Sequence, residues 1–318
     1  MNYHILLLET IDQAALDILQ RHTSVEILKA YEEKSAESLA SQYQVHAIIT
    51  RGKGQVQATL MDACPQLRAI ARCGVGLDNI DIDAASQRKI PVLNAPGSNA
   101  ATIAEHALSL MLMLVRNMHQ SVNQVKEANW QWRTQYSGDE LGGKTLGVLG
   151  MGNIGQRVAR FAEVIGMKVI YWDMREAEVS YPKLSLQEVL QQSDVVTVHL
   201  PLTEQTEGLL SEETLEMMRP HAYLINTARG QIIDQVALRK MLQNENLAGF
   251  AADVLAKEPP PEHDPLLSMP NVLITPHSGS LTATTYRHMC VLSVNNVLAV
   301  LEGKEPQAGC IFNEKVLA

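Results

Sequence analysis

Arg229 is the residue whose type and position first point to chemistry in this sequence. It lies in the segment NTARGQI (226–232), just past an apolar run that is short enough to be a buried strand, and directly before Gly230. A structural arginine usually lies on a helix face, with its stem over apolar surface and its charged head in water. Ligands of α/β folds bind at the carboxyl ends of strands. The position therefore indicates a ligand-binding arginine, with a solvated surface arginine as the alternative.

A glycine-rich turn has the form of a dinucleotide-binding motif. Gly150-x-Gly152-x-x-Gly155 follows a predicted strand and opens a segment rich in helix formers. Its glycines would permit a tight turn, approach to a pyrophosphate and close packing of helix on strand. Asp173 ends the next predicted strand and would bind ribose hydroxyls and repel a 2′-phosphate. The motif predicts NAD as cofactor. Arg175 is the one feature that favours NADP, and a glycine-rich turn without a ligand is the alternative.

A second phosphate-loop pattern overlaps this region. The segment GDELGGKT (138–145) matches G-x-x-x-x-G-K-[ST] of nucleotide triphosphatases. That loop requires a strand before it and a helix after it. Here Lys144 and Thr145 precede a predicted strand, so we interpret the match as accidental.

Composition restricts the partners. The 318-residue chain has a formal net charge of −9 and a pI near 5.6, which argues against a nucleic acid or an anionic membrane surface as partner. A small anionic substrate stays compatible, because a few local arginines can outweigh the mean field. Four cysteines without C-x-x-C spacing, and a start without the features of a signal peptide, predict a cytoplasmic protein without a metal site. The longest strongly apolar run, 107–115, is too short to span a membrane.

Strands and helices alternate along the chain, and its length of 318 residues suggests two domains. Predicted strands occupy 3–9, 25–29, 45–50, 67–72, 90–96, 145–150, 168–173, 195–200, 222–226, 249–254 and 271–276. Predicted helices occupy 12–21, 58–65, 81–89 (with Asp81 as a cap), 101–120 and 281–303, with further helical stretches between the later strands. Runs rich in Val, Ile and Leu that are separated by helices are typical of parallel sheets covered on both faces.

This alternation predicts an α/β fold of two Rossmann-like domains with parallel sheets. We expect a substrate-binding, flavodoxin-like domain at 1–97 plus 284–318, because the terminal helix would cross back to the first unit. We expect a dinucleotide-binding domain at 98–283. Two long crossing helices would join the domains around an interdomain cleft.

Six ordered motifs resemble those of the NAD-dependent D-isomer-specific 2-hydroxyacid dehydrogenases. The motifs are RCGVGLDNID (72–81), GVLGMGNIG (147–155), VHLPLT (198–203), NTARG (226–230), DVLAKEP (253–259) and TPHSG (275–279). The resemblance covers nearly the whole chain and is strongest to D-3-phosphoglycerate dehydrogenases. It implies that Arg229, Glu258 and His277 are the catalytic residues. It also implies cofactor contacts from the glycine motif and from several later strand ends: Gly150, Gly152, Asn153, Ile154, Gly155, Asp173, Leu200, Pro201, Thr206, Thr227, Ala228, Asp253 and Gly279.

The chemistry of hydride transfer to a carbonyl explains these three catalytic types. A proton must move on the substrate oxygen, and His277 is suited to this because imidazole titrates near neutral pH. Glu258 would fix one imidazole tautomer and stabilise imidazolium. The fork of Arg229 would bind a carboxylate and polarise the neighbouring carbonyl. Formate dehydrogenases carry glutamine at the position of Glu258, so glutamate favours a hydroxy acid. Taken alone, Glu258 could be a solvated loop charge and His277 a turn histidine.

Substrate binding is expected to involve the first domain as well. The resemblance implies that backbone N–H groups of Val75 and Gly76 bind the substrate carboxylate. Phosphate-binding arginines of the phosphoglycerate enzymes match Arg51, Arg72 and Arg133, the last from a segment that reaches across a dimer interface in the family. Thr134 stands where a second basic residue often follows, and Val75 where threonine is typical. A surface arginine is the alternative for each.

The resemblance predicts a homodimer that acts on 3-phosphoglycerate/3-phosphohydroxypyruvate. A reductase of hydroxypyruvate, glyoxylate or another 2-keto acid is the alternative, since an unphosphorylated substrate does not need three further arginines. An NAD-sensing corepressor of the same fold is a third possibility. Such proteins carry partner-binding extensions, which we do not expect here.

Overall fold

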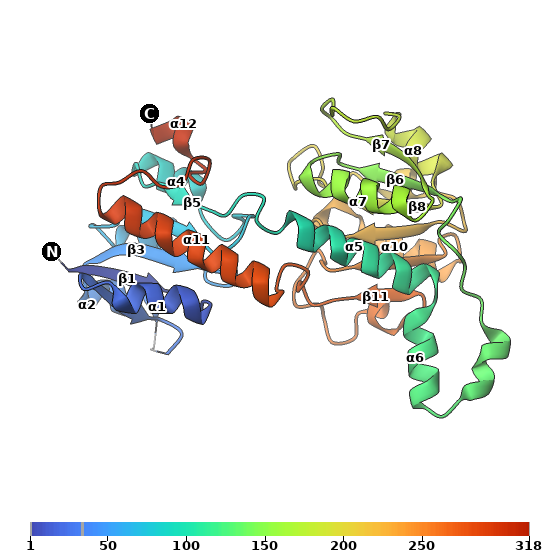
Figure 1. Ribbon diagram of the computed structural model, residues 1–318, viewed down its shortest axis with the longest axis horizontal. Helices are drawn as coiled ribbons and strands as arrows, with labels where there is room; N and C mark the ends of the chain where they lie inside the picture. Colours follow the sequence, from blue (N-terminus) through green and yellow to red (C-terminus); the bar gives the residue numbers. More distant parts are fainter. Residues whose placement is uncertain (1, 33–34, 318) are drawn as a thin grey trace. The chain divides into compact units, whose positions relative to one another are not determined.

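The computed structural model describes residues 2–32 and 35–317 and divides into two compact units. Unit 1 consists of Met1–Asn99 and Leu281–Ala318, and unit 2 of Ala100–Ser280 (Figure 1). Both units are built on parallel sheets between helices, so the predicted α/β class is confirmed. The interdomain cleft and its hinge stay predictions. Within the described residues, no helix combines the length and apolarity that crossing a membrane requires.

Unit 1 contains a five-stranded sheet in the order β2-β1-β3-β4-β5. Its strands are β1 (Tyr3–Leu7), β2 (Val25–Lys29), β3 (Val45–Thr50), β4 (Ala69–Arg72) and β5 (Val92–Leu93). From β1 the chain first adds β2 on one side of the sheet and then crosses to β3 on the other side. The carboxyl ends of β1 and β3 therefore form the topological switch point. Open α/β sheets bind their ligands at such a point.

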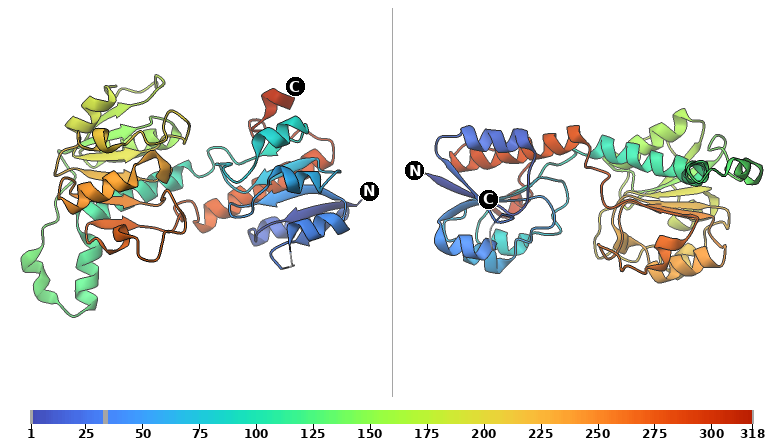
Figure 2. Two further views of the ribbon diagram at one scale, coloured as in Figure 1. Left: turned by 180° about the vertical axis from the view of Figure 1, so that it is seen from behind. Right: turned by 90° about the horizontal axis from the view of Figure 1, so that it is seen from below.

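Side chains of successive strand residues point to opposite faces of the sheet and pack into two separate hydrophobic cores in unit 1. On one face, helices α1 (Gln13–Arg21) and α11 (Ala283–Leu301) lie side by side and bury residues such as Leu19 and Val294 (Figure 2). The other face is covered by α2 (Ala36–Gln42), α3 (Ala58–Asp62) and α4 (Ile82–Gln87). The predicted Asp81 cap of α4 is confirmed by a 2.9 Å bond from the Ala84 N–H. A short α12 (Glu314–Leu317) follows α11.

Unit 2 contains a six-stranded parallel sheet in the order β11-β10-β9-β8-β6-β7. Its strands are β6 (Thr145–Leu149), β7 (Lys168–Trp172), β8 (Val195–Val198), β9 (Tyr223–Asn226), β10 (Gly249–Ala252) and β11 (Val272–Ile274). The switch point here lies between β6 and β8. Because Thr145 is the first residue of β6, no helix follows the GKT sequence, as the interpretation of an accidental match requires.

Helices cover both faces of this second sheet. One core includes α5 (Ala100–Val115) and α7 (Asn153–Val164), and the other includes α8 (Leu186–Gln192), α9 (Glu212–Leu215) and α10 (Gln235–Gln243). The short helices η1, η2 and η3 span Trp130–Gln135, Gly230–Ile232 and Pro265–Ser268.

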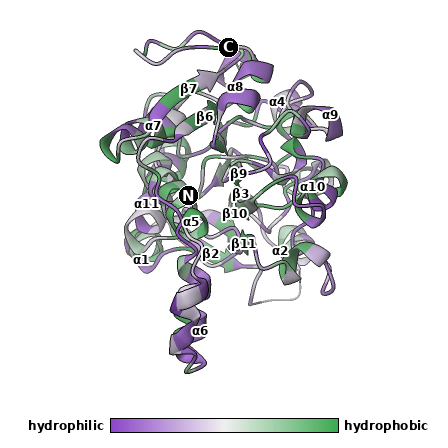
Figure 3. Ribbon diagram, turned by 90° about the vertical axis from the view of Figure 1, so that its right-hand side faces the viewer, coloured by the Kyte–Doolittle hydropathy of each residue, from purple (hydrophilic) through white to green (hydrophobic). Residues whose placement is uncertain are grey.

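The prediction of one continuous helix over 101–120 is wrong. The helix ends at Val115, and α6 (Met118–Lys126) starts after Asn117, whose φ of 51° is left-handed. Asparagine tolerates this conformation better than most residues. Burial also ends here, because α5 buries eight residues and α6 buries none. Figure 3 shows α5 coloured mainly hydrophobic and α6 mainly hydrophilic, and α6 projects away from the sheet of its unit.

Candidate active site and cofactor site

Three neighbouring strands of unit 2 place the predicted catalytic residues at one edge of the sheet. Arg229 follows β9, Glu258 follows β10 and His277 follows β11, and these strands are adjacent and parallel. Their carboxyl ends therefore meet at the same edge. The sheet order brings together three residues that are up to 48 positions apart in the chain.

Gly230 explains how the loop that carries Arg229 reaches the loop that carries Glu258. A Cβ built on Gly230 would lie 2.0 Å from the carbonyl carbon of Leu255 and 2.1 Å from the nitrogen of Ala256. No side chain fits there, so glycine is required by close backbone approach. The side chain of Asn226 donates to the carbonyl of Arg229 at 2.9 Å and closes the turn.

The side chains of His277 and Glu258 form a direct hydrogen-bonded pair. Nδ1 of His277 lies 2.7 Å from Oε2 of Glu258, and Oε1 accepts the N–H of Leu255 at 2.9 Å. Burial alone would raise the pKa of Glu258, but the bonds from His277 and Leu255 outweigh it and lower that pKa. An ionised carboxylate accepts at Nδ1–H, so Nε2 of His277 is left for proton exchange with a ligand.

The backbone at His277 is strained, and Asp253 holds it. His277 has a φ of 52°, a left-handed conformation that is uncommon outside glycine. The carboxylate of Asp253 accepts bonds from Thr275 Oγ1 (2.6 Å), Ser278 N (2.9 Å) and Gly279 N (2.8 Å), while its carbonyl accepts the His277 N–H at 2.9 Å. These four contacts bracket His277 on both sides and fix its position.

The carboxylate of Asp253 is almost completely buried, with 2% relative exposure. Burial would raise its pKa, but bonds from His106, Thr275 and the two backbone N–H groups lower it. Nε2 of His106, on α5, lies 2.9 Å from Thr275 Oγ1 and 3.5 Å from Asp253 Oδ1. Asp253 is thus an ionised anchor inside unit 2, and its predicted contact with a cofactor stays a prediction.

The glycine motif has the geometry expected of a turn from strand to helix. Gly150 has a φ of +98°, and a Cβ on it would approach His199 to 2.8 Å. A Cβ on Gly155 would lie 2.0 Å from the carbonyl oxygen of Gly150. The predicted structural roles of these two glycines, in the tight turn and in helix packing, are confirmed.

Gly152 is different, because no neighbour among the described residues requires a glycine there. Its φ is −77°, and a Cβ on it would meet nothing within 4 Å. It caps α7 without a side chain, so the first N–H groups of that helix, including those of Asn153 and Ile154, receive no side-chain cap. Open space in front of a helix N-terminus suits a pyrophosphate. The residues present fit a dinucleotide.

Asp173 lies between the glycine loop and Arg175. Its Oδ2 accepts the N–H of Met151 at 2.7 Å, and its Oδ1 accepts the N–H of Arg175 at 2.9 Å. The side chain is therefore fixed beside the glycine loop, at the end of β7, where the fingerprint requires an acidic residue. Arg175 itself is exposed.

Two buried polar atoms at the carboxyl ends of β8 and β9 make no hydrogen bond among the described residues. They are Oγ1 of Thr227, which follows β9, and Nδ1 of His199, which follows β8. Burial removes the His199 ring from solvent and lowers its pKa to about 3, so the ring is neutral at neutral pH. A buried unpaired hydroxyl is costly, and a ligand that binds it removes that cost. Thr227 was among the predicted cofactor contacts.

The remaining predicted cofactor residues lie on neighbouring loops. Leu200 and Ala228 are buried and Pro201 is exposed. Gly279 packs so closely against Asp253 and His106 that a Cβ there would lie 2.8 Å and 3.1 Å from their side chains. The hydroxyl of Thr206 is fully buried and donates to the Pro201 carbonyl at 2.6 Å, so it shapes its own loop. Their contacts with a cofactor stay predictions.

In unit 1, Arg51 and Arg72 lie at the carboxyl ends of β3 and β4, and both make internal contacts. Arg72 Nε donates to the Arg51 carbonyl at 2.9 Å, and its Nη1 donates to the carbonyl of Gly76. Arg51 Nη1 lies 3.4 Å from the hydroxyl of Tyr286, with its guanidinium 5.6 Å from the ring centre. The carbonyl of Val75 accepts from Asn94 at 2.8 Å. Arg133 is exposed on η1 of unit 2.

Sequence reasoning missed several residues that hold these loops, above all Glu9, His106 and Tyr286. Glu9 comes just after an apolar strand, which was a usable signal, but its partners are 41 to 45 positions away. His106 lies within an apolar helix, where a core histidine is the ordinary interpretation.

Comparison with known proteins agrees with this geometry. Residues 108–279 match the family model described as "D-isomer specific 2-hydroxyacid dehydrogenase, NAD binding domain". The chain belongs to this family. The predicted resemblance is thereby confirmed, and the members of the family are NAD(P)-dependent oxidoreductases.

Proteins similar to this chain are named for different substrates. The chain is 35% identical over 305 residues to a D-3-phosphoglycerate dehydrogenase of Archaeoglobus fulgidus. The aligned region covers 94% of this chain and 57% of that protein. It is 35% identical over 303 residues to a hydroxypyruvate reductase of Thermotoga maritima, covering 94% and 98%. The chain thus spans little more than half the length of the phosphoglycerate dehydrogenase.

A solved structure extends the similarity to the fold. The glyoxylate/hydroxypyruvate reductase of Sinorhizobium meliloti, described as NADPH-dependent and solved with NADP and malonate, is 29% identical. It aligns with a TM-score of 0.86 and covers 96% of each chain. The family therefore includes members that use either nicotinamide cofactor.

Proposed function

We propose that this protein is a nicotinamide-dependent oxidoreductase that interconverts a small 2-keto acid and its D-2-hydroxy acid. The 2.7 Å pair of His277 and Glu258, at the same sheet edge as Arg229, carries the proposal. Reduction of a carbonyl carbon needs a proton on its oxygen, and Nε2 of His277 would deliver it. The bound nicotinamide would supply or accept the hydride.

Arg229 would bind the substrate carboxylate through its planar fork and draw electron density from the adjacent carbonyl. Its Nη1 donates to the carbonyl of Ala228 at 2.7 Å, which fixes the guanidinium beside the loop after β9. Glu258 would hold the His277 ring in one orientation and stabilise imidazolium. Backbone N–H groups of Val75 and Gly76 would add the second carboxylate contact.

Among 2-keto acids, we propose an unphosphorylated one, hydroxypyruvate or glyoxylate. Arg51 and Arg72 support this choice, because both engage protein groups, and the Nε of Arg51 lies 3.8 Å from a Glu9 oxygen. Thr134 and Val75 also differ from the residues typical of phosphoglycerate enzymes. Phosphohydroxypyruvate is the second candidate, because Arg51 and Arg72 occupy the strand ends where a phosphate could be bound.

NADH oxidation with a panel of 2-keto acids tests the proposal. The panel consists of hydroxypyruvate, glyoxylate, phosphohydroxypyruvate, pyruvate and 2-ketoisocaproate. We expect the highest kcat/KM with hydroxypyruvate or glyoxylate. A kcat/KM at least tenfold higher with phosphohydroxypyruvate would select the second candidate, and no turnover with any of them would reject the proposed reaction.

We propose NAD as the preferred cofactor and a cytoplasmic homodimer as the working form. Asp173, fixed beside the glycine loop, supports NAD because it would repel a 2′-phosphate. The dimer proposal rests on the projecting segment of unit 2. There Met118, Val122 and Val125 of α6 are 49%, 50% and 55% exposed and lie three or four residues apart, on one helix face.

A further inference from the structure

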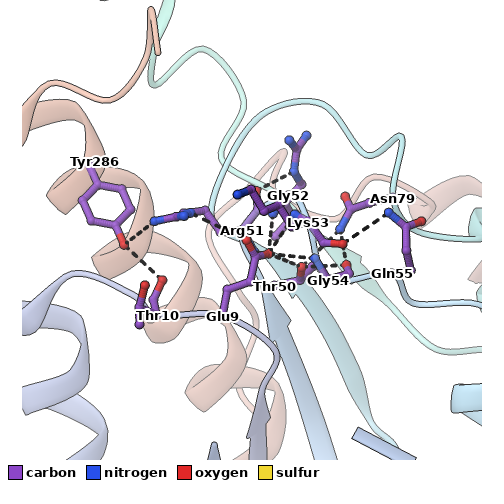
Figure 4. Close-up of polar contacts among 11 residues, drawn as sticks. Glu9, Thr10, Thr50, Arg51, Gly52, Lys53, Gly54, Gln55, Asn79 and Tyr286 are labelled. Carbon is purple, nitrogen blue, oxygen red and sulfur yellow. Dashed lines mark hydrogen bonds and ion pairs between the residues drawn. The ribbon is translucent and has the colours of Figure 1, made fainter. Parts of the chain in front are cut away.

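The carboxylate of Glu9 collects an unusual set of hydrogen bonds in unit 1. Five donors converge on its single oxygen Oε2 (Figure 4). They are the backbone N–H groups of Arg51 (2.9 Å), Gly52 (2.7 Å), Lys53 (3.0 Å) and Gly54 (3.0 Å) and the hydroxyl of Thr50 (3.0 Å). Successive N–H groups that point inward form an anion-binding nest. Here the protein fills the nest with its own carboxylate.

The location of this nest is the topological switch point of the sheet. Glu9 follows β1 and the loop 51–54 follows β3, and these strands are neighbours in the sheet. Ligands of open α/β sheets bind in the crevice beyond such strand ends. Glu9 therefore shapes the ligand-binding edge of unit 1.

The surrounding contacts make the loop rigid. Asn79, which is buried, donates to the Gly54 carbonyl at 2.6 Å and to Thr50 Oγ1 at 3.1 Å. A Cβ on Gly54 would lie 2.6 Å from the Cβ of Leu8, so only glycine fits. Burial would raise the pKa of Glu9, but the four backbone N–H groups outweigh it and lower the pKa to about 2. Glu9 is ionised at any working pH.

Glu9 also acts on the charge of Arg51. Its Oε1 lies 3.8 Å from Arg51 Nε, while the Tyr286 hydroxyl and ring hold the other end of the guanidinium. The Arg51 side chain is only 33% exposed and that of Glu9 11%, so solvent screens this pair incompletely. The negative charge of Glu9 offsets part of the positive charge that Arg51 presents to a ligand.

The same loop connects to the predicted carboxylate-binding loop after β4. Arg72 Nε binds the Arg51 carbonyl, and its Nη1 binds the carbonyl of Gly76. Arg72 thus links the 51–54 loop, which Glu9 holds, to the loop that contains Val75 and Gly76.

We propose that Glu9 is a positioning residue that determines substrate specificity. It fixes the 51–54 loop and, by offsetting the charge of Arg51, favours a 2-keto acid with a single carboxylate over one that also carries a phosphate. This inference rests on the proposed function, because it assumes that a 2-keto acid binds at this edge.

The substitution Glu9→Gln separates charge from shape, since glutamine keeps an acceptor oxygen and removes the charge. We measure kcat/KM for phosphohydroxypyruvate and hydroxypyruvate at low and high salt. The ratio of the first to the second should rise about tenfold in E9Q at low salt. At high salt the rise should be smaller but still present, because salt screens partly buried charges only incompletely. The dissociation constant of NADH should not change. Glu305→Gln, which removes an exposed charge from the same unit, is the matched control and should leave the ratio unchanged.

The substitution Glu9→Ala removes both charge and acceptor. We expect faster hydrogen exchange at the amides of residues 51–54 and a KM raised at least tenfold for both substrates, with kcat changed less. E9Q should restore most of the exchange protection, whereas a merely structural role would lower Tm without changing KM.

Two results would overturn the proposal. An unchanged substrate ratio in E9Q would remove its role in specificity, and unchanged exchange of residues 51–54 in E9A would remove its positioning role. Exchange does not depend on turnover, so it still decides the positioning role if the wild-type protein reduces none of the 2-keto acids. Should E9A fail to fold, exchange and kinetics of E9Q decide both points.

Discussion

Nδ1 of His277 lies 2.7 Å from Oε2 of Glu258, and the other oxygen of that carboxylate is held by the N–H of Leu255. The carboxylate is thus anchored by backbone and orients the ring. Because the bonds at Glu258 favour its ionised form, the pair can stabilise imidazolium at neutral pH.

Glu258→Gln should shift the pH profile of reduction to lower pH. Reduction requires imidazolium, and loss of the neighbouring negative charge of Glu258 removes the interaction that stabilises imidazolium, so the acid form is lost at lower pH. The check is kcat/KM for keto-acid reduction between pH 5 and 9. His277→Ala is the reference and should lower kcat by about 10²–10⁴-fold with NADH binding retained. An unchanged profile in the glutamine variant would leave Glu258 without a role in proton transfer.

Arg229→Lys should stay severely impaired although the charge is kept. Lysine lacks the planar fork that binds two oxygens at once. Steady-state kinetics should give a raised KM together with a lowered kcat, since the contact serves both binding and carbonyl polarisation. Activity near that of the wild type would mean that charge alone suffices at this position.

Asp253→Asn should lower kcat by about one to two orders of magnitude, because an amide cannot accept all the bonds that fix the backbone on both sides of His277. Thr275→Val removes one of these bonds at a residue without a predicted cofactor contact. We expect T275V to lower kcat with little change in the dissociation constant of NADH, and D253N to change both. Normal turnover in both variants would exclude the anchoring role.

Asp173→Ser should raise kcat/KM with NADPH at least tenfold and lower it with NADH. The serine removes the repulsive carboxylate, and the exposed Arg175 then becomes a partner for a 2′-phosphate. The double variant D173S/R175A is the control and should lose most of the gain. Preference for NADPH in the wild-type protein would contradict the assignment of Asp173.

Val122→Glu combined with Val125→Glu should convert the proposed dimer to a monomer. Two charges on the apolar face of α6 would have to be buried in the interface. Sedimentation velocity measures the mass. Val164→Glu on α7, where the native side chain is 86% exposed, is the matched control and should not change it. A monomeric wild-type protein at micromolar concentration would reject the dimer.

Local signals in the sequence were sufficient for the elements and for much of the candidate site. Apolar runs of strand length located the strands, and the glycine motif located the turn into α7, because turn and helix preferences act over a few residues. The same locality led to an error at Asn117, where apolar periodicity continued past the point at which burial ends.

The tertiary structure decided which strand ends meet and what holds them. Only the strand order β11-β10-β9 makes Arg229, Glu258 and His277 neighbours, and only folding brings Glu9 to the N–H groups of a loop more than 40 residues away. The resemblance implies a phosphate-binding role for Arg72, which stays a prediction. Only the tertiary structure shows that its side chain also binds the carbonyl groups of Arg51 and Gly76. The sequence by itself determines residue types and local conformation. Hydrogen-bond partners between distant loops depend on how strands pair and cores pack, and no short-range pattern encodes that pairing.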